Sequence, residues 1–192
     1  MDVEPHRKAL RRVEYPNHAR YLTFSCYQRR PLMDEPDVRD AVADQVLLTR
    51  ERLGFRVFAW VVMPEHVHLL IVPGECTTFP EILSAIKRPV ATRVLRAWRS
   101  GEDQRLELAT LPDGKHRFWQ AHGGYDRNIL DGHELAEKVG YIHANPVRRG
   151  LVQVPGDWDW SSARASAGLE TRWPVIDGAS GDMGWPRGGN RC

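Results

Sequence analysis

Apolar residues recur at a helical period in three segments of the chain, and these segments predict three helices. The helices are expected over about 37–53, 79–99 and 132–145. The second begins with a capping box, because Glu81 follows Thr78 by three residues, and Pro89 in its middle is expected to kink or split it. Asn145 is expected to end the third helix, since the residue before a proline disfavours helical dihedral angles.

Four other segments are rich in β-branched and aromatic residues, and they predict strands. The strands are expected over 21–27, 55–63, 66–72 and 116–121. Pro64 and Glu65 form a turn between the second and third, which are therefore expected to pair as a hairpin. The order strand, helix, strand, strand, helix, strand indicates an α+β, ferredoxin-like fold with an antiparallel sheet and two helices on one face. The additional C-terminal helix is the candidate to cover the other face.

The length of 192 residues favours one domain with extensions. We expect a basic N-terminal arm over 1–19 and a folded domain over 20–164. Residues 165–192 are rich in Gly, Pro and Trp without periodicity, so an irregular or flexible tail is expected there.

Two histidines interrupt the apolar segment VVMPEHVHLLIVP, residues 61–73. Side chains alternate across a strand, so His66 and His68 are expected on one face, and Val67, Leu69 and Ile71 on the other. Two imidazoles at this spacing suit a single divalent ion. The alternative is a pair of core histidines whose ring nitrogens have hydrogen-bond partners. The spacing alone does not decide between the two.

The last predicted helix offers further candidate chemistry in the segment EKVGYIHANPVRRGL. Tyr141 and Asn145 are four residues apart and share one helix face. Tyr141 is a candidate nucleophile, and Asn145 could give a carbonyl oxygen to an ion held by the histidines. The alternatives are a half-buried helix tyrosine and an asparagine that only ends the helix.

The overall composition says little about function, whereas the distribution of charge along the chain indicates a class of substrate. With 42% hydrophobic and 27% charged residues the chain is typical of a soluble globular protein, and a net charge of +2 does not demand a polyanionic partner. The basic residues nevertheless cluster in an N-terminal arm and in pairs at segment ends, and beside candidate metal ligands such clusters favour a phosphate-rich substrate. Each pair is equally consistent with solvated surface.

The remaining signals concern location. No apolar run reaches the ~20 residues of a membrane-spanning helix, and the N-terminal segment has no apolar core of a secretory leader. Cys26, Cys76 and Cys192 lack metal-type spacing, so we expect reduced thiols in a cytoplasmic protein.

Four motifs occur in a fixed order between Tyr21 and Arg164, namely VVMPEHVHLLI, FWQAHGGYDRNI, YIHANPVRRGLV and DWDWSSAR. Together they resemble the REP-associated tyrosine transposases, a branch of the single-tyrosine HUH transposases. The resemblance implies a bacterial protein that acts at the nucleoid on single-stranded or hairpin DNA of REP type, as a monomer or homodimer. It also implies the ferredoxin-like fold.

The resemblance assigns roles to individual residues. His66, His68 and Asn145 match the ligands of Mg²⁺ or Mn²⁺, and Tyr141 matches the tyrosine that attacks a phosphodiester and leaves a 5′-phosphotyrosine. Tyr125 is a second tyrosine nearby, which we disfavour because it lacks the asparagine partner. The candidates for contacts with the DNA backbone are basic: Arg7, Lys8, Arg11, Arg12, Arg29, Arg30, Arg127, Arg148 and Arg149.

Besides the tyrosine transposase activity that the resemblance implies, the sequence leaves two other functions open. One is a hairpin DNA-binding protein without catalysis, retained for regulation. The other is a metal-dependent hydrolase that uses water as its nucleophile.

Overall fold

A computed structural model describes residues 18–121, 124–173 and 177 of the chain. The elements follow one another as β1 (Arg20–Ser25), α1 (Pro36–Leu53), β2 (Arg56–Val62), β3 (His66–Val72), α2 (Phe79–Ser100), α3 (Arg105–Leu108), β4 (Tyr125–Asn128), α4 (Gly132–Arg148) and α5 (Ala163–Ser166). Two short 3₁₀ helices, η1 (Tyr27–Arg29) and η2 (Pro155–Asp157), complete the set.

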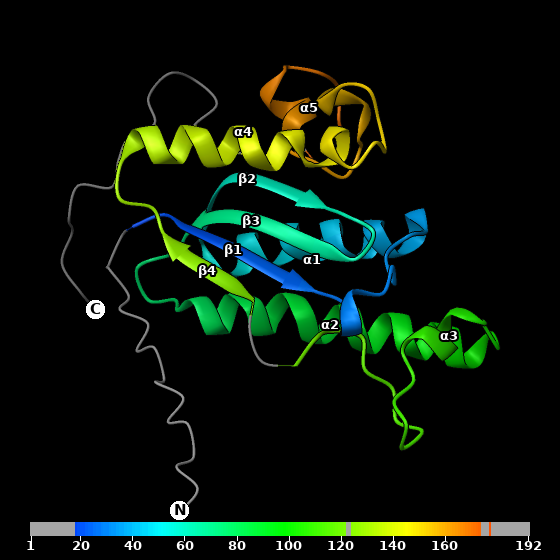
Figure 1. Ribbon diagram of the computed structural model, residues 1–192. Helices are drawn as coiled ribbons and strands as arrows, with labels where there is room; N and C mark the ends of the chain where they lie inside the picture. Colours follow the sequence, from blue (N-terminus) through cyan, green and yellow to red (C-terminus); the bar gives the residue numbers. More distant parts are fainter. Residues whose placement is uncertain (1–17, 122–123, 174–176, 178–192) are drawn as a thin grey trace, which may run out of the picture.

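The strands form one antiparallel sheet in the order β2-β3-β1-β4. Helices α1 and α2 lie on one face of this sheet, and α4 crosses the other face (Figure 1). The α+β class, the order of the first six main elements, the antiparallel sheet and the additional helix are therefore confirmed. The ferredoxin-like assignment itself stays a prediction.

Strand alternation divides the core into two layers. Val67, Leu69 and Ile71 are fully buried in the layer shared with α1 and α2. On the opposite face, Leu70 packs in a second cluster with Ile142 of α4. All residues of β3 are buried, because α1 and α2 cover one face of the strand and α4 covers the other. By alternation, His66 and His68 share the α4 face with Leu70, as expected.

The fourth strand differs from the prediction. Residues 116–121 form no strand of the sheet; they make only isolated bridges, such as Cys26 with Trp119, and bury Phe118 and Trp119 in the α1–α2 layer. Aromatic content in this segment reflects side-chain burial rather than strand pairing. The true strand, β4, is the polar sequence YDRN, which pairs with β1 at the sheet edge.

The approach of β4 to β1 depends on a glycine. A Cβ atom on Gly124 would lie 1.9 Å from the carbonyl oxygen of Thr23, which no side chain allows. Gly124 therefore lets the chain come close enough for β4 to pair.

Neither Pro89 nor Pro146 interrupts its helix, so Pro89 does not split the second predicted helix and Asn145 does not end the third. Helix α2 continues through Pro89, and its buried face runs from Phe79 to Trp98. Helix α4 continues through Pro146 to Arg148, so Asn145 does not end it. Asn145 and Pro146 are both buried, and packing of the last turn against the sheet outweighs the lost backbone hydrogen bond.

The described part of the expected tail is irregular but packed. Trp173 is buried against Trp60, and Asp177 forms an ion pair of 2.5 Å with Arg50 of α1. These contacts lie on the α1 side of the sheet, away from the histidines.

In the part of the chain that the structure describes, no helix is long and apolar enough to cross a membrane. Cys26 is a buried free thiol, whereas Cys76 is disulfide-bonded, so the expectation of reduced thiols is wrong for Cys76. Cys192 lies outside the described residues.

Candidate active site

The two histidines of β3 meet on the α4 face of the sheet. Both are almost completely buried, and their Nε2 atoms are 2.9 Å apart. In register with them, β1 contributes Tyr21 and Thr23, whose hydroxyl oxygens each lie 2.7 Å from Nδ1 of His68. The ring of Tyr21 also stacks on His68, with centroids 5.3 Å apart. The prediction that His66 and His68 share one face is confirmed.

Glu65, to which the sequence assigned no role, contacts His66 at the ring nitrogen that faces away from His68. Its Oε1 atom accepts a hydrogen bond from Nδ1 of His66 at 3.0 Å and another from Arg149 at 2.7 Å. Burial alone would raise the pKa of Glu65, but these hydrogen bonds and charges outweigh burial and lower its pKa to about 2. Glu65 is therefore ionised at neutral pH and can only accept from His66.

Burial also sets the protonation of the neighbouring groups. It lowers the pKa of His68 to about 3, with further lowering by the charges of His66 and Arg29. Burial raises the pKa of Tyr21 to about 12, so Tyr21 keeps its proton. His68 is consequently a neutral imidazole, the form that binds metal ions.

Helix α4 carries Tyr141 to this pair. The Tyr141 side chain is 38% exposed, and its ring centroid lies 5.8 Å from that of His68. Two cations flank the ring: Nζ of Lys138 lies 5.7 Å from its centroid and the guanidinium carbon of Arg148 lies 5.1 Å from it. The structure thus brings together a partly exposed phenol, two buried imidazoles and two positive charges, an arrangement that suits attack on a phosphate.

Asn145 lies one helical turn beyond Tyr141 on α4. It is buried, and its amide nitrogen donates to the backbone carbonyl of Tyr141 at 2.9 Å. This bond leaves the amide oxygen as the atom that could face an ion. Among the described residues, no group of three or more His, Cys, Asp or Glu side chains could hold a metal ion. Asn145 is the third ligand that the sequence suggests, and its role as a ligand stays a prediction.

The donor set of the histidine pair nevertheless fits a divalent cation. Two nitrogens that bind one ion at ~2.1 Å and at a right angle are about 3 Å apart, close to the observed 2.9 Å. Glu65 holds the Nδ1 proton of His66, which leaves the lone pair on Nε2. The hydroxyls of Tyr21 and Thr23 can donate to or accept from Nδ1 of His68 and therefore support either tautomer.

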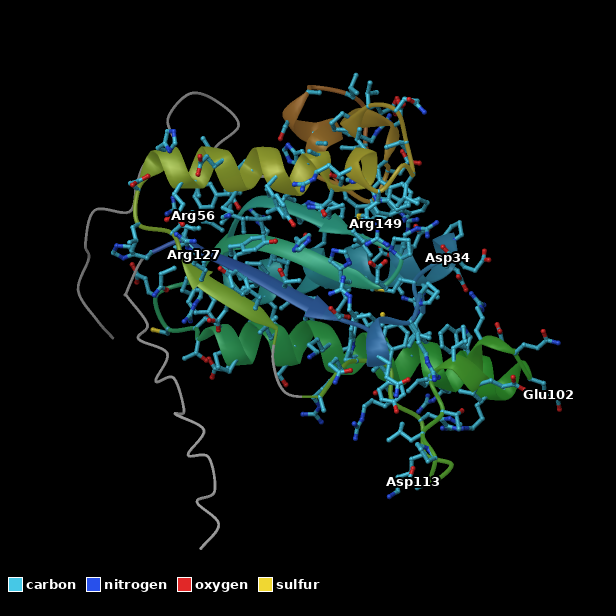
Figure 2. The ribbon with its side chains drawn as sticks, in the orientation of Figure 1. Asp34, Arg56, Glu102, Asp113, Arg127 and Arg149 are labelled. Carbon is cyan, nitrogen blue, oxygen red and sulfur yellow. The ribbon has the colours of Figure 1, made fainter. Side chains whose placement is uncertain are left out.

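The candidate DNA contacts separate into three groups. Arg29, Arg148 and Arg149 lie around the histidine pair and Tyr141. Arg30 instead donates to the carbonyl of Leu108, and Arg127 pairs with Glu134 at 2.7 Å. Figure 2 shows Arg149 near the β2–β3 turn and Arg127 on β4 at the other end of the sheet. The candidates Arg7, Lys8, Arg11 and Arg12 lie outside the described residues.

Tyr125 contacts the ring of Tyr21, whereas Tyr141 contacts both Tyr21 and His68. Tyr125 pairs with Thr23 across β1–β4, is 57% exposed, and meets the ring of Tyr21 edge-on with centroids 5.9 Å apart. No ring contact joins Tyr125 to either histidine among those of the described residues.

Sequence reasoning missed four residues of the site: Tyr21, Thr23, Glu65 and Lys138. Tyr21 and Thr23 alternate along β1 as the histidines alternate along β3, so the signal existed, but its use required knowing that β1 and β3 are neighbours. Glu65 belongs to the β2–β3 turn, where strand alternation does not predict direction.

The fold and site define a class of protein: an antiparallel α+β sheet with a paired-histidine strand beneath a helix that presents a tyrosine. Within that class, this chain is similar to the REP-associated tyrosine transposases. One relative, from Haemophilus influenzae, is 28% identical over 115 residues, which are 59% of this chain and 62% of the relative. Another, from Escherichia coli K12, is 27% identical over 134 residues, 67% of this chain and 69% of the relative. Both have REP-associated tyrosine transposase in their names.

A solved structure of a REP-associated tyrosine transposase bound to a REP hairpin has the same fold. It superposes with a TM-score of 0.63 at 20% identity and covers 94% of this chain and 98% of the other. No family model matches the chain. The resemblance expected from the four motifs is therefore confirmed, although the match spans less than two thirds of the Haemophilus relative.

Proposed function

We propose that this protein is a metal-dependent, single-stranded DNA endonuclease and strand transferase that acts on REP-type hairpin DNA. The observation that carries the proposal is the contact of the partly exposed Tyr141 ring with His68, 5.8 Å between centroids. A nucleophile and a buried histidine pair on two different elements are parts that metal-assisted phosphodiester cleavage can use. The names of the two relatives and the hairpin bound by the structural neighbour support the choice of substrate.

In the proposed reaction, the Tyr141 oxygen attacks the scissile phosphorus and the bond to the 3′ oxygen breaks. The phenol proton passes to solvent, and the departing 3′ oxygen takes a proton. The products are a 5′-phosphotyrosine and a free 3′-hydroxyl. Attack by a 3′-hydroxyl on the phosphotyrosine reverses the step and joins strands, so no external energy source is needed.

His66, His68 and the amide oxygen of Asn145 would hold Mg²⁺ or Mn²⁺. The bound ion would polarise the scissile phosphate and neutralise the charge that develops on it. Lys138 and Arg148, which flank the Tyr141 ring, would attract the DNA backbone to the phenol. Because the proposed substrate is chromosomal DNA, we also propose action at the bacterial nucleoid in the cytoplasm.

The decisive experiment is adduct formation. Purified protein is incubated with a labelled hairpin and its adjoining single strand, with Mg²⁺ or Mn²⁺, and resolved on a denaturing gel. We expect a covalent protein–DNA adduct with the wild-type protein and none with Tyr141→Phe. An adduct at wild-type yield with Tyr141→Phe would show that the nucleophile is wrong, and nicking without an adduct would favour a water nucleophile.

A second candidate function is hairpin binding without catalysis. The observation that favours it is that no group of three or more His, Cys, Asp or Glu side chains in the described part of the chain could hold a metal ion. It predicts tight hairpin binding with neither nicks nor adducts under all divalent ions. In that case Tyr141→Phe would bind as the wild-type protein does.

A further inference from the structure

The carboxylate of Glu65 links two parts of the site that are far apart in the sequence. It is buried in the turn between β2 and β3, with its side chain 8% exposed. One of its oxygens, Oε1, accepts two hydrogen bonds, from Nδ1 of His66 at 3.0 Å and from the guanidinium of Arg149 at 2.7 Å. Arg29 lies farther away, at 3.6 Å, and is a weaker partner.

We propose that Glu65 is a positioning residue for His66 and that Arg149 ties Glu65 to the helix that carries Tyr141. The inference rests on the proposed function, because it assigns these two residues to the same histidine pair. It also replaces the predicted role of Arg149 as a contact to the DNA backbone, because its guanidinium binds Glu65 instead.

The first half of the proposal follows from donor and acceptor chemistry. An ionised carboxylate can only accept a hydrogen bond, so the proton of His66 must sit on Nδ1 and the lone pair on Nε2. That lone pair points at Nε2 of His68, 2.9 Å away. Without Glu65 the His66 ring would be free to take the other tautomer, which places a proton where an ion would bind.

The second half follows from the position of Arg149. It is the residue directly after α4, and its side chain is 52% exposed while that of Glu65 is 8% exposed. The ion pair therefore fastens the C-terminal end of α4 to the β2–β3 turn. Tyr141 and Asn145 are on the same helix, so their placement relative to His66 depends on this bond.

The test begins with the tautomer of His66 in the metal-free protein, measured by long-range ¹H–¹⁵N NMR. We expect the Nδ1-protonated form in the wild-type protein, its loss in Glu65→Ala, and its retention in Glu65→Gln, whose amide oxygen can still accept. Glu51→Ala, an exposed carboxylate on α1, is the control and should leave the tautomer unchanged. An unchanged His66 tautomer in Glu65→Ala would overturn the proposal.

The second measurement is the affinity for Mn²⁺ without DNA, by calorimetry. Loss of a carboxylate that orients a ligating histidine is expected to weaken binding by about 10- to 100-fold, so Glu65→Ala should show that loss. Arg149→Ala should weaken it several-fold, and Arg88→Ala, an exposed arginine on α2, should not. Equal affinity of Arg149→Ala and the wild-type protein would remove Arg149 from the proposal.

The two measurements separate this inference from the proposed function. If the wild-type protein binds no Mn²⁺, the metal dependence fails, yet the His66 tautomer still decides whether Glu65 positions it. If the wild-type protein binds Mn²⁺ and forms adducts while Glu65→Ala keeps both the tautomer and the affinity, only the inference fails. Should Glu65→Ala not fold, Arg149→Ala provides the affinity test, because its side chain is half exposed.

Discussion

The ring of Tyr141 meets the imidazole of His68 at an interplanar angle of 71°, with centroids 5.8 Å apart. One residue comes from α4 and the other from β3, and neither element contains the whole site. Any change that shifts α4 across the sheet therefore alters the distance between the proposed nucleophile and the histidine pair.

Removal of divalent ions is expected to stop nicking. With the histidine pair as ligands, EDTA should abolish adduct formation, and Mn²⁺ should restore it better than Mg²⁺, because nitrogen ligands suit Mn²⁺ better. His68→Ala should reduce the nicking rate at least about 100-fold while hairpin binding persists. A gel assay of nicking across a titration of each ion measures both effects, and full activity in EDTA would contradict the metal proposal.

Tyr125 is expected to contribute to binding and not to attack. Its exposed ring could stack on an unpaired base, and such stacking is worth ~1–3 kcal/mol. Tyr125→Ala should therefore weaken single-strand binding by roughly 5-fold or more, whereas Tyr125→Phe should bind and form adducts normally. Fluorescence anisotropy with a labelled single strand gives the affinity. Loss of the adduct in Tyr125→Phe would exchange the roles of the two tyrosines.

Arg148 is expected to contact the DNA backbone. Its guanidinium packs over the Tyr141 ring and is exposed, so Arg148→Ala should weaken hairpin binding and reduce the slope of log affinity against log salt by about one unit. Arg88→Ala, on the opposite side of the sheet, is the matched loss of one positive charge. Equal salt slopes for the two variants would remove Arg148 from the interface.

The buried His143 is expected to make the folded protein less stable in mild acid. Burial lowers its pKa to about 4 from the ordinary 6.5, and its Nε2 atom lies 2.8 Å from Oγ of Ser162. Because the folded pKa is depressed, the unfolded state binds more protons below pH 6.5. The stability contribution is then fully present above pH 6.5 and is lost as the pH falls toward 4, by at most about 3 kcal/mol.

The measurement for His143 is denaturant unfolding between pH 7 and pH 4. His143→Gln keeps a neutral polar side chain but cannot titrate, so its unfolding free energy should fall less steeply over this range. Parallel pH profiles for the wild-type protein and His143→Gln would show that His143 is not the titrating group.

The histidine pair shows which features of the fold can be predicted from local sequence patterns. A period of two determines which side chains share a strand face, and strand β3 was predicted with its observed bounds, His66–Val72. Leu135 and Ile142 likewise mark the buried stripe of α4. These features depend only on backbone geometry and on the burial of apolar side chains, which the sequence carries directly.

The errors have a common origin in tertiary packing. The segment 116–121 has strand composition but inserts Phe118 and Trp119 into the core, while the polar YDRN pairs with β1 because Gly124 allows the approach. Asn145 stays helical before Pro146 because the last turn of α4 is buried. In each case a packing energy that no local rule contains outweighs the local preference.

The sequence by itself therefore determined the order of elements, the sorting of His66 and His68 to one face, and the motifs that resemble a known family. Only the tertiary structure decided which groups surround the pair: Tyr21 and Thr23 from β1, Glu65 from the turn and Arg149 from the end of α4. The physical reason is that these contacts join strands and a helix distant in the chain. Their partners follow from sheet register and helix docking, not from the spacing of residues.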